Sequence, residues 1–194
     1  MKKFLAILIL IFSLQTPSQA DDIRDFQIEG ISLGDSALKY VSETVLKRNE
    51  ENWFNDNEYS ISAGLRPSIL NTYDTLQFAY FTNDKKYKLQ GIEGIKFYRN
   101  NIDECNSKFD KIVLDIKEAF SNISVGKKDK MKHEYDKSGK STYTYQELVF
   151  QNGDSIFLAC EDWSIESGYG DSDCLRISLR KKNYSSFLTY KAYK

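Results

Sequence analysis

The sequence predicts a single α+β domain over residues 21–194, with a mostly antiparallel sheet of about five or six strands and two main helices packed on one face. Three observations favour this class. Segments with the two-residue periodicity of strands outnumber segments with helical spacing. Asn152-Gly153 is typical of the tight turn of a hairpin, which joins antiparallel strands. Beyond residue 20, Pro67 is the only proline and no Ser/Gly-rich linker occurs, so no domain boundary is expected.

The expected strands are short and are separated by turns. Cys174–Arg180 alternates apolar and polar side chains, so one face of the sheet should be solvated there. Thr72–Thr82 and Tyr87–Tyr98 flank a polar turn of the kind that closes a hairpin. The full set of expected strands is Phe26–Leu33, Thr72–Thr82, Tyr87–Tyr98, Tyr143–Phe150, Ser155–Cys160 and Cys174–Arg180.

Two segments have the apolar spacing of a helix that packs on a sheet. The first is Ser36–Arg48, with its serine at the N-cap position. The second is Ile102–Phe120. Asn101 directly precedes this segment and Glu104 follows three residues later, which is the spacing of a capping box. A short docking helix is also expected within Tyr184–Tyr193.

The first twenty residues are typical of a secretory signal peptide. Lys2 and Lys3 precede the apolar run Phe4–Leu14, and small residues up to Ala20 offer a cleavage site. Asp21 and Asp22 follow the cleavage site directly, at the position where a lipoprotein would carry the cysteine that bears its lipid. No later apolar run reaches the roughly 18 to 20 residues that cross a bilayer. We therefore expect a periplasmic or secreted protein without a membrane anchor, cleaved near Ala20.

The three cysteines predict one disulfide and one remaining thiol in an oxidising compartment. Cys105 continues the apolar series of the second helix, and Cys160 continues the apolar face of its strand. Cys174 falls in phase with the polar residues of its own strand. Periodicity therefore favours the pair Cys105–Cys160, with Cys160–Cys174 across a hairpin as the alternative.

Composition and motifs argue against several classes of function. The formal net charge of −1 at pH 7 argues against nucleic-acid binding. Asp136–Ser141 ends like a phosphate-binding loop but lacks its first glycine and the strand before it. The single histidine does not suit zinc, and Asp171 and Asp173 lack the glycine and glutamate of an EF-hand. We expect no metal and no cofactor.

The most specific catalytic pattern is Gly30–Gly34, which has the G-x-S-x-G spacing of a nucleophile elbow with Ser32 as the nucleophile. That elbow belongs to a parallel sheet, and no βα units precede it here. The only histidine, His133, lies in a lysine-rich segment. Glycines also explain a tight turn without any nucleophile. A small serine hydrolase is therefore the alternative, and a non-catalytic function is the expectation.

Elimination leaves binding as the expected function and two charged loops as the candidate site. Val125–Ser141 is rich in lysine and too charged to pack, whereas Glu161–Asp173 is acidic and carries aromatic residues. Aromatic anchors with charges that set orientation suit a protein or an envelope polymer as partner. The candidate binding residues are Lys137, Lys140, Asp162, Trp163 and Tyr169.

Several short stretches together resemble a family of small exported proteins of marine alphaproteobacteria. The resemblance implies export and overall architecture, but it brings no known activity and no catalytic residue. It also implies that Cys105 and Cys160 are the family's cysteines, whereas Cys174 departs from that pattern. The matching stretches are Phe26–Gly30 with Ser32, Gly34–Ser36, Thr72–Asp74, Asn83–Lys85 with Tyr87, Asn100–Ile102 with Cys105, Asp136–Ser141, and Cys160 with Asp162–Ser164.

Overall fold

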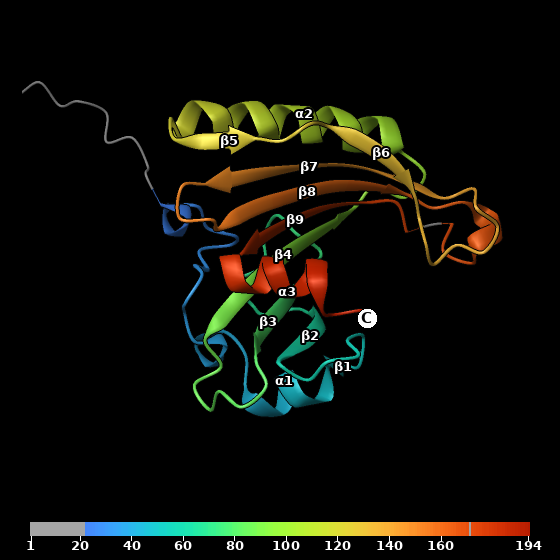
Figure 1. Cartoon of the computed structure of the whole chain (residues 1–194). Helices are drawn as coiled ribbons and strands as arrows, with labels where there is room; N and C mark the ends of the chain where they lie inside the picture. Colours follow the sequence, from blue (N-terminus) through green and yellow to red (C-terminus); the bar gives the residue numbers. More distant parts are fainter. Residues whose placement is uncertain (1–21, 171) are drawn as a thin grey trace, which may run out of the picture.

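The computed structural model describes residues 22–170 and 172–194, so the predicted signal peptide lies outside the described residues (Figure 1). The strands are β1 Glu50–Glu51, β2 Tyr59–Leu65, β3 Thr75–Phe81, β4 Leu89–Phe97, β5 Ile123–Val125, β6 Asp129–Lys132, β7 Thr142–Phe150, β8 Ser155–Asp162 and β9 Cys174–Arg180. The α-helices are α1 Glu43–Arg48, α2 Ile102–Ala119 and α3 Lys182–Tyr190, and the short 3-10 helices are η1 Ile23–Asp25, η2 Ala37–Lys39 and η3 Ile165–Ser167.

All nine strands belong to one sheet, in the order β1-β2-β3-β4-β9-β8-β7-β5, and β6 also pairs with β7. Every pair of neighbouring strands is antiparallel. The prediction of five or six strands was therefore wrong, because strands also form in two regions where none was expected.

Two of these additional strands show why the predicted number was too low. In β2, Tyr59 and Ile61 alternate with serines, and both faces are buried. The buried Ser62 hydroxyl lies 2.8 Å from the Tyr80 hydroxyl, so a polar side chain is accommodated in the core. Strand β6 is exposed along its whole length and pairs only with β7. A charged edge strand needs no buried side chain, so part of the expected Val125–Ser141 loop is in fact a strand.

Helix α2 covers one face of the sheet, at the top of Figure 1. Its Phe109 and Ile116 share an apolar core with Leu158 of β8 and Ile177 of β9. The helix begins after Asn101, whose Oδ1 accepts the Glu104 backbone N–H at 3.3 Å. This hydrogen bond confirms the predicted capping pattern. The predicted span is also confirmed, since the observed helix ends at Ala119, one residue before the predicted end.

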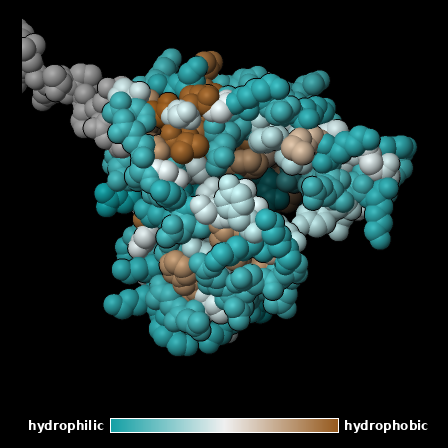
Figure 2. All heavy atoms as spheres, in the orientation of Figure 1, coloured by the Kyte–Doolittle hydropathy of each residue, from teal (hydrophilic) through white to brown (hydrophobic). Residues whose placement is uncertain are grey.

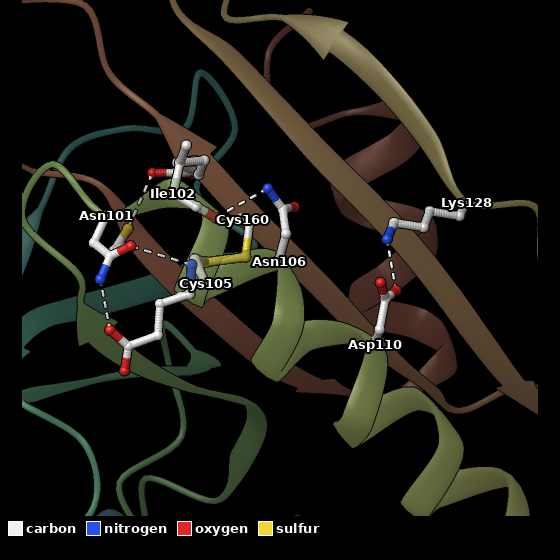
Figure 3. Close-up of a disulfide and its surroundings, with 10 residues drawn as sticks. Asn101, Ile102, Cys105, Asn106, Asp110, Lys128 and Cys160 are labelled. Carbon is white, nitrogen blue, oxygen red and sulfur yellow. Dashed lines mark hydrogen bonds and ion pairs between the residues drawn. A yellow bond between two sulfur atoms is a disulfide. The ribbon is translucent and has the colours of Figure 1, made fainter.

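The predicted disulfide joins Cys105 of α2 to Cys160 of β8, with the two Cα atoms 6.0 Å apart (Figure 3). Further along the same helix, Asp110 accepts Lys128 Nζ at 2.6 Å, which connects α2 to the segment between β5 and β6. Cys174 is a buried free thiol. The covalent link therefore fixes α2 to the middle of the sheet.

Helix α3 lies on the opposite face from α2. Its Tyr184 and Phe187 pack on Tyr59 and Ile61 of β2. A Cβ atom on Gly91 would lie 2.4 Å from Tyr184 Cε1, so the glycine permits the close approach of the helix. The two main predicted helices, Ser36–Arg48 and Ile102–Phe120, do contribute to one core, but the expectation that helices cover only one face was wrong, because α3 packs on the other face.

The N-terminal segment also differs from its prediction. Phe26–Leu33 is not a strand: Ile28 and Ile31 form an isolated bridge around a tight turn. Glu29 and Gly30 occupy that turn at φ 53° and 77°, in the left-handed region. The predicted helix of Ser36–Arg48 is divided into η2 and α1, with Ser36 capping the first and Ser42 the second.

Candidate functional site

The face of the sheet that carries α3 is only partly covered. Helix α3 crosses it near the β7–β8 turn, where Ser185 Oγ lies 3.4 Å from Glu147 Oε1. The opposite ends of β7, β8 and β9 continue into the loops around η3. Figure 2 shows the surface hollowed between α3 and these loops. We call this region the open face; it consists of the residues of β4, β7, β8 and β9 that point away from α2, together with His133, Trp163 and Tyr169 of the adjoining loops.

An ion triad of two buried carboxylates and one partly exposed arginine forms the floor of the open face. Arg176 of β9 donates from Nε to Glu93 Oε1 of β4 at 2.9 Å and from Nη1 to Glu161 Oε1 of β8 at 3.1 Å. Glu93 is 6% exposed and Glu161 is 9% exposed. Buried charges need partners of this kind, because a lone charge in an apolar interior is strongly destabilising.

Two members of the triad, Glu161 and Arg176, have pKa values that keep them charged at neutral pH. Burial alone would raise the pKa of Glu161, but the Arg176 guanidinium and His133 outweigh it and lower the pKa to about 2. Burial would likewise lower the pKa of Arg176, but the carboxylates of Glu93 and Glu161 outweigh it and raise that pKa. With one cation and two carboxylates, the triad carries a net negative charge.

The buried free thiol of Cys174 lies next to the triad. Its Sγ donates to Glu161 Oε2 at 3.5 Å. Burial first, and then the charge of Glu161, raises the pKa of the thiol well above its usual range. A thiol held in its neutral form is a poor nucleophile, so Cys174 is suited to packing and not to catalysis.

Six rings form a continuous row across the open face, which we call the aromatic row. Starting at η3, the ring centroids of neighbours are separated by 5.0, 3.9, 5.7, 5.5 and 5.8 Å. Tyr169 is exposed and the other five side chains are partly buried, with the His133 side chain only 12% exposed. At the far end, the Arg180 guanidinium lies 4.2 Å from the centroid of the Phe157 ring. The members are Tyr169, Trp163, His133, Tyr143, Tyr145 and Phe157.

The row is attached to the ion triad at one point. Trp163 Nε1 donates to Glu161 Oε2 at 3.2 Å, and its backbone N–H donates to Asp173 Oδ1 at 2.8 Å. His133 Nε2 lies 3.8 Å from Glu161 Oε1. The indole ring is therefore oriented by the buried carboxylate of Glu161.

The two predicted loops contact each other and are organised by Asp136. Its Oδ2 accepts the Ser141 backbone N–H at 2.7 Å and the Ser164 hydroxyl at 3.3 Å. Burial would raise the pKa of Asp136, but the hydrogen bonds from Ser141 and Ser138 outweigh it and lower that pKa below its ordinary range. A charged, fully bonded aspartate fixes the relative position of the loops and so of Trp163.

The predicted site residues have different positions. Trp163 and the 56% exposed Tyr169 both belong to the aromatic row. Lys140 forms an ion pair with Glu166 of the other loop, so these two opposite charges bind each other. Asp162 lies on the α2 side of β8, 4.0 Å from Lys130 Nζ. Lys137 is exposed at the loop surface. The structure thus brings two of the five residues together on the open face.

Ser32 is not placed like a catalytic serine. Its hydroxyl accepts Gln27 Nε2 at 3.1 Å and donates to the Arg24 carbonyl at 3.4 Å. The contacts of His133 are with Glu161 and with neighbouring rings. Within the described ranges, no hydrogen bond joins Ser32 to a histidine. Gly30 and Gly34 both have positive φ, which accounts for the glycine pattern by turn geometry.

Most residues of the open face were not identified from the sequence as candidates for the site. Tyr143 and Tyr145 occupy every second position of β7, and Phe157 lies between the buried Ile156 and Leu158 of β8, so the two-residue period of a strand could have placed the three rings on one face. Glu93 and Arg176 are 83 positions apart, and only the pairing of β4 with β9 brings them into contact. No pattern of neighbouring residues in the sequence could therefore have predicted the triad.

Comparison with known proteins gives no further indication of function, so the proposal below is based on the open face and its residues. No protein-family model, curated protein or solved structure matches the chain. Within residues 22–170 and 172–194, no helix is long and apolar enough to cross a bilayer. The same residues contain no group of three His, Cys, Asp or Glu side chains placed to hold a metal ion.

Proposed function

We propose that this is an exported, non-catalytic binding protein that holds a glycan chain along its open face. The aromatic row is the observation that carries the proposal. Sugar rings have flat C–H faces that stack on Trp and Tyr rings, and several adjacent rings suit an extended polymer better than a single small molecule. An envelope polysaccharide is the polymer that an exported protein of this kind would meet.

The charged groups beside the row support a polar ligand. Arg180 lies over Phe157 and, within the described residues, has no carboxylate at ion-pair distance. Its guanidinium and the phenol group of Tyr145 offer donors to sugar hydroxyls or to the carboxylate of an acidic sugar, whereas the Tyr143 hydroxyl donates to Met131 Sδ at 3.6 Å. Stacking would supply affinity, and these donors would set orientation.

The binding measurement uses isothermal titration calorimetry with soluble peptidoglycan and chitin oligosaccharides as probes. We expect Trp163→Ala and Tyr145→Ala each to weaken binding by about tenfold or more. Trp53→Ala is the matched control, because Trp53 is the chain's other tryptophan and is 45% exposed away from the row. It should bind as the wild type does.

Two outcomes would contradict the proposal. One is that none of these glycans binds to the folded protein. The other is that Trp53→Ala weakens binding as much as Trp163→Ala does. A separate assay tests the hydrolase alternative: labelling by a fluorophosphonate probe that Ser32→Ala abolishes would make this chain an enzyme.

Export is part of the same proposal and has its own measurement. N-terminal sequencing of the protein recovered from the envelope or the medium should begin at Asp21, since cleavage is expected after Ala20. A product that retains Met1 and fractionates with the cytoplasm would contradict export without affecting the binding test.

A further inference from the structure

A second site lies apart from the aromatic row, where β4 ends and β3 begins. A pocket of about 580 Å³ opens there between the segment after β2 and the segment after β4. This volume suits a small organic molecule. The lining residues are Arg66, Pro67, Leu70, Tyr73, Asp74, Lys96, Phe97 and Arg99.

The charges of the pocket are unbalanced in favour of anions. Asp74 is its only lining carboxylate, and it already accepts Lys96 Nζ at 3.2 Å and the Phe97 backbone N–H at 2.8 Å. Burial would raise the pKa of Asp74, but these two donors, together with the nearby positive charges of Lys96 and Arg66, outweigh it and lower the pKa. Arg66 and Arg99 therefore supply two positive charges beyond the Lys96–Asp74 pair.

Both arginines are available to a ligand. Across residues 22–170 and 172–194, neither guanidinium has a carboxylate within ion-pair distance. Both are exposed and line the pocket from different segments. Arg99 has φ 33° and the next residue φ 63°, so a left-handed backbone turns the chain at the pocket's edge. Two guanidinium groups that converge on one space can clamp an oxyanion through paired N–H donors.

One wall of the pocket is apolar, whereas most of its exposed lining is polar. Tyr73 lies flat against β4 at Gly94, where an added Cβ would lie 2.8 Å from the Tyr73 ring. Pro67, Leu70 and Phe97 complete this wall. A cationic rim beside an aromatic wall suits a molecule with an anionic group at one end and an apolar ring or chain at the other.

We infer that this pocket is a binding site for a small organic anion, in which Arg66 and Arg99 hold a carboxylate or phosphate group and Tyr73 packs against its apolar part. The site is independent of glycan binding on the open face. Carboxylate and phosphate share the oxyanion chemistry that the arginines recognise, and the choice between them is made by the probes.

The test titrates the protein with phenyl phosphate and benzoate, and with benzyl alcohol as the neutral analogue, using ligand-observed NMR and calorimetry. We expect at least one of the two anions to bind and benzyl alcohol not to bind at about 10 mM. Arg66→Gln and Arg99→Gln should each weaken binding by about fivefold or more. Arg48→Gln removes the same charge from an exposed position on α1 and should change affinity by less than about twofold.

Asp74→Asn adds a prediction of opposite sign. The amide oxygen can still accept the Phe97 N–H, but the negative charge is lost, so anion affinity should rise by about twofold or more. The proposal is overturned if neither anion binds, if benzyl alcohol binds as well as they do, or if the arginine variants bind like Arg48→Gln. Weaker binding by folded Asp74→Asn would equally contradict it.

Discussion

The two faces of β8 and β9 are made from alternate residues of the same short segments, yet they have opposite characters. Towards α2 they present Leu158, Cys160 and Ile177, which are buried in the apolar core. Away from α2 they present Glu161 and Arg176, which are paired in the ion triad. The first face resembles the interior of any protein in which a helix packs on a sheet, whereas the second contains charges and aromatic rings that the fold alone does not need.

This difference separates structural residues from functional ones. The α2 face is closed by a helix and a disulfide, so substitutions there should act on stability. The open face is closed by α3 over only part of its area, and its rings and Arg180 meet solvent. If the account is right, substitutions on the open face that leave the triad intact should affect binding far more than folding.

Loss of the disulfide should be the largest effect, and it belongs to the α2 face. The bridge spans 55 positions, so replacing both cysteines in Cys105→Ser/Cys160→Ser should lower the free energy of unfolding by about 4 kcal/mol in the chain-entropy account. Urea denaturation measures this. Cys174→Ser, which removes a thiol from the other face, is the control and should lose about 1 kcal/mol or less. Equal losses would contradict the assignment.

Removal of Arg176 should come next, because it leaves Glu93 and Glu161 buried without their cation. We expect Arg176→Met to lower the free energy of unfolding by about 3 kcal/mol. A triple variant that also carries Glu93→Leu and Glu161→Leu should recover most of that loss, because no unpaired charge remains. A single variant as stable as the wild type would show that the triad is solvated and not buried.

The pH dependence of stability should be smaller and should depend on Glu161. Its folded pKa of about 2 is below the ordinary value of 4.5, so its contribution is fully present above the unfolded pKa and is lost as the pH falls through the folded one. Between about pH 5 and pH 2.5 we expect a loss of about 2 kcal/mol that Glu161→Gln largely lacks. Parallel pH profiles for the two proteins would contradict the lowered pKa.

The smallest effect should come from the ion pair between the loops. Lys140 and Glu166 are more than half exposed, so solvent screens their attraction. Lys140→Met should change the free energy of unfolding by less than about 0.5 kcal/mol, like the exposed control Lys137→Met. A loss above about 1 kcal/mol would mean that this pair, and not Asp136, fixes the loops.

Local signals in the sequence predicted the local parts of the structure. The capping pattern at Asn101 and the apolar series after it predicted α2 because both act within one helix. Asn152-Gly153 predicted the β7–β8 hairpin for the same reason, since its turn geometry depends on adjacent residues. Periodicity predicted the disulfide, because each cysteine continued an apolar face of its own element.

The rest depended on contacts between distant segments. The buried serines of β2 are tolerated because Tyr80 and the Leu46 carbonyl bond to Ser62. The position of α3 opposite α2 depends on Gly91 and on the aromatic residues of β2. Likewise, the charges of the two loops suggested a partner, but Lys140 and Glu166 largely satisfy each other. The sequence shows which side chains are charged, but it does not show which side chains they contact in the folded protein.

NMR mapping of glycan binding onto the two faces would show directly whether the open face is the binding surface. Amide chemical shifts of the uniformly labelled protein would be compared with and without a soluble peptidoglycan or chitin oligosaccharide. We expect changes in β7, in β8 and around Trp163 and Tyr169, with α2 unaffected. Changes confined to α2 and its side of the sheet, or no changes at saturating glycan, would contradict the account.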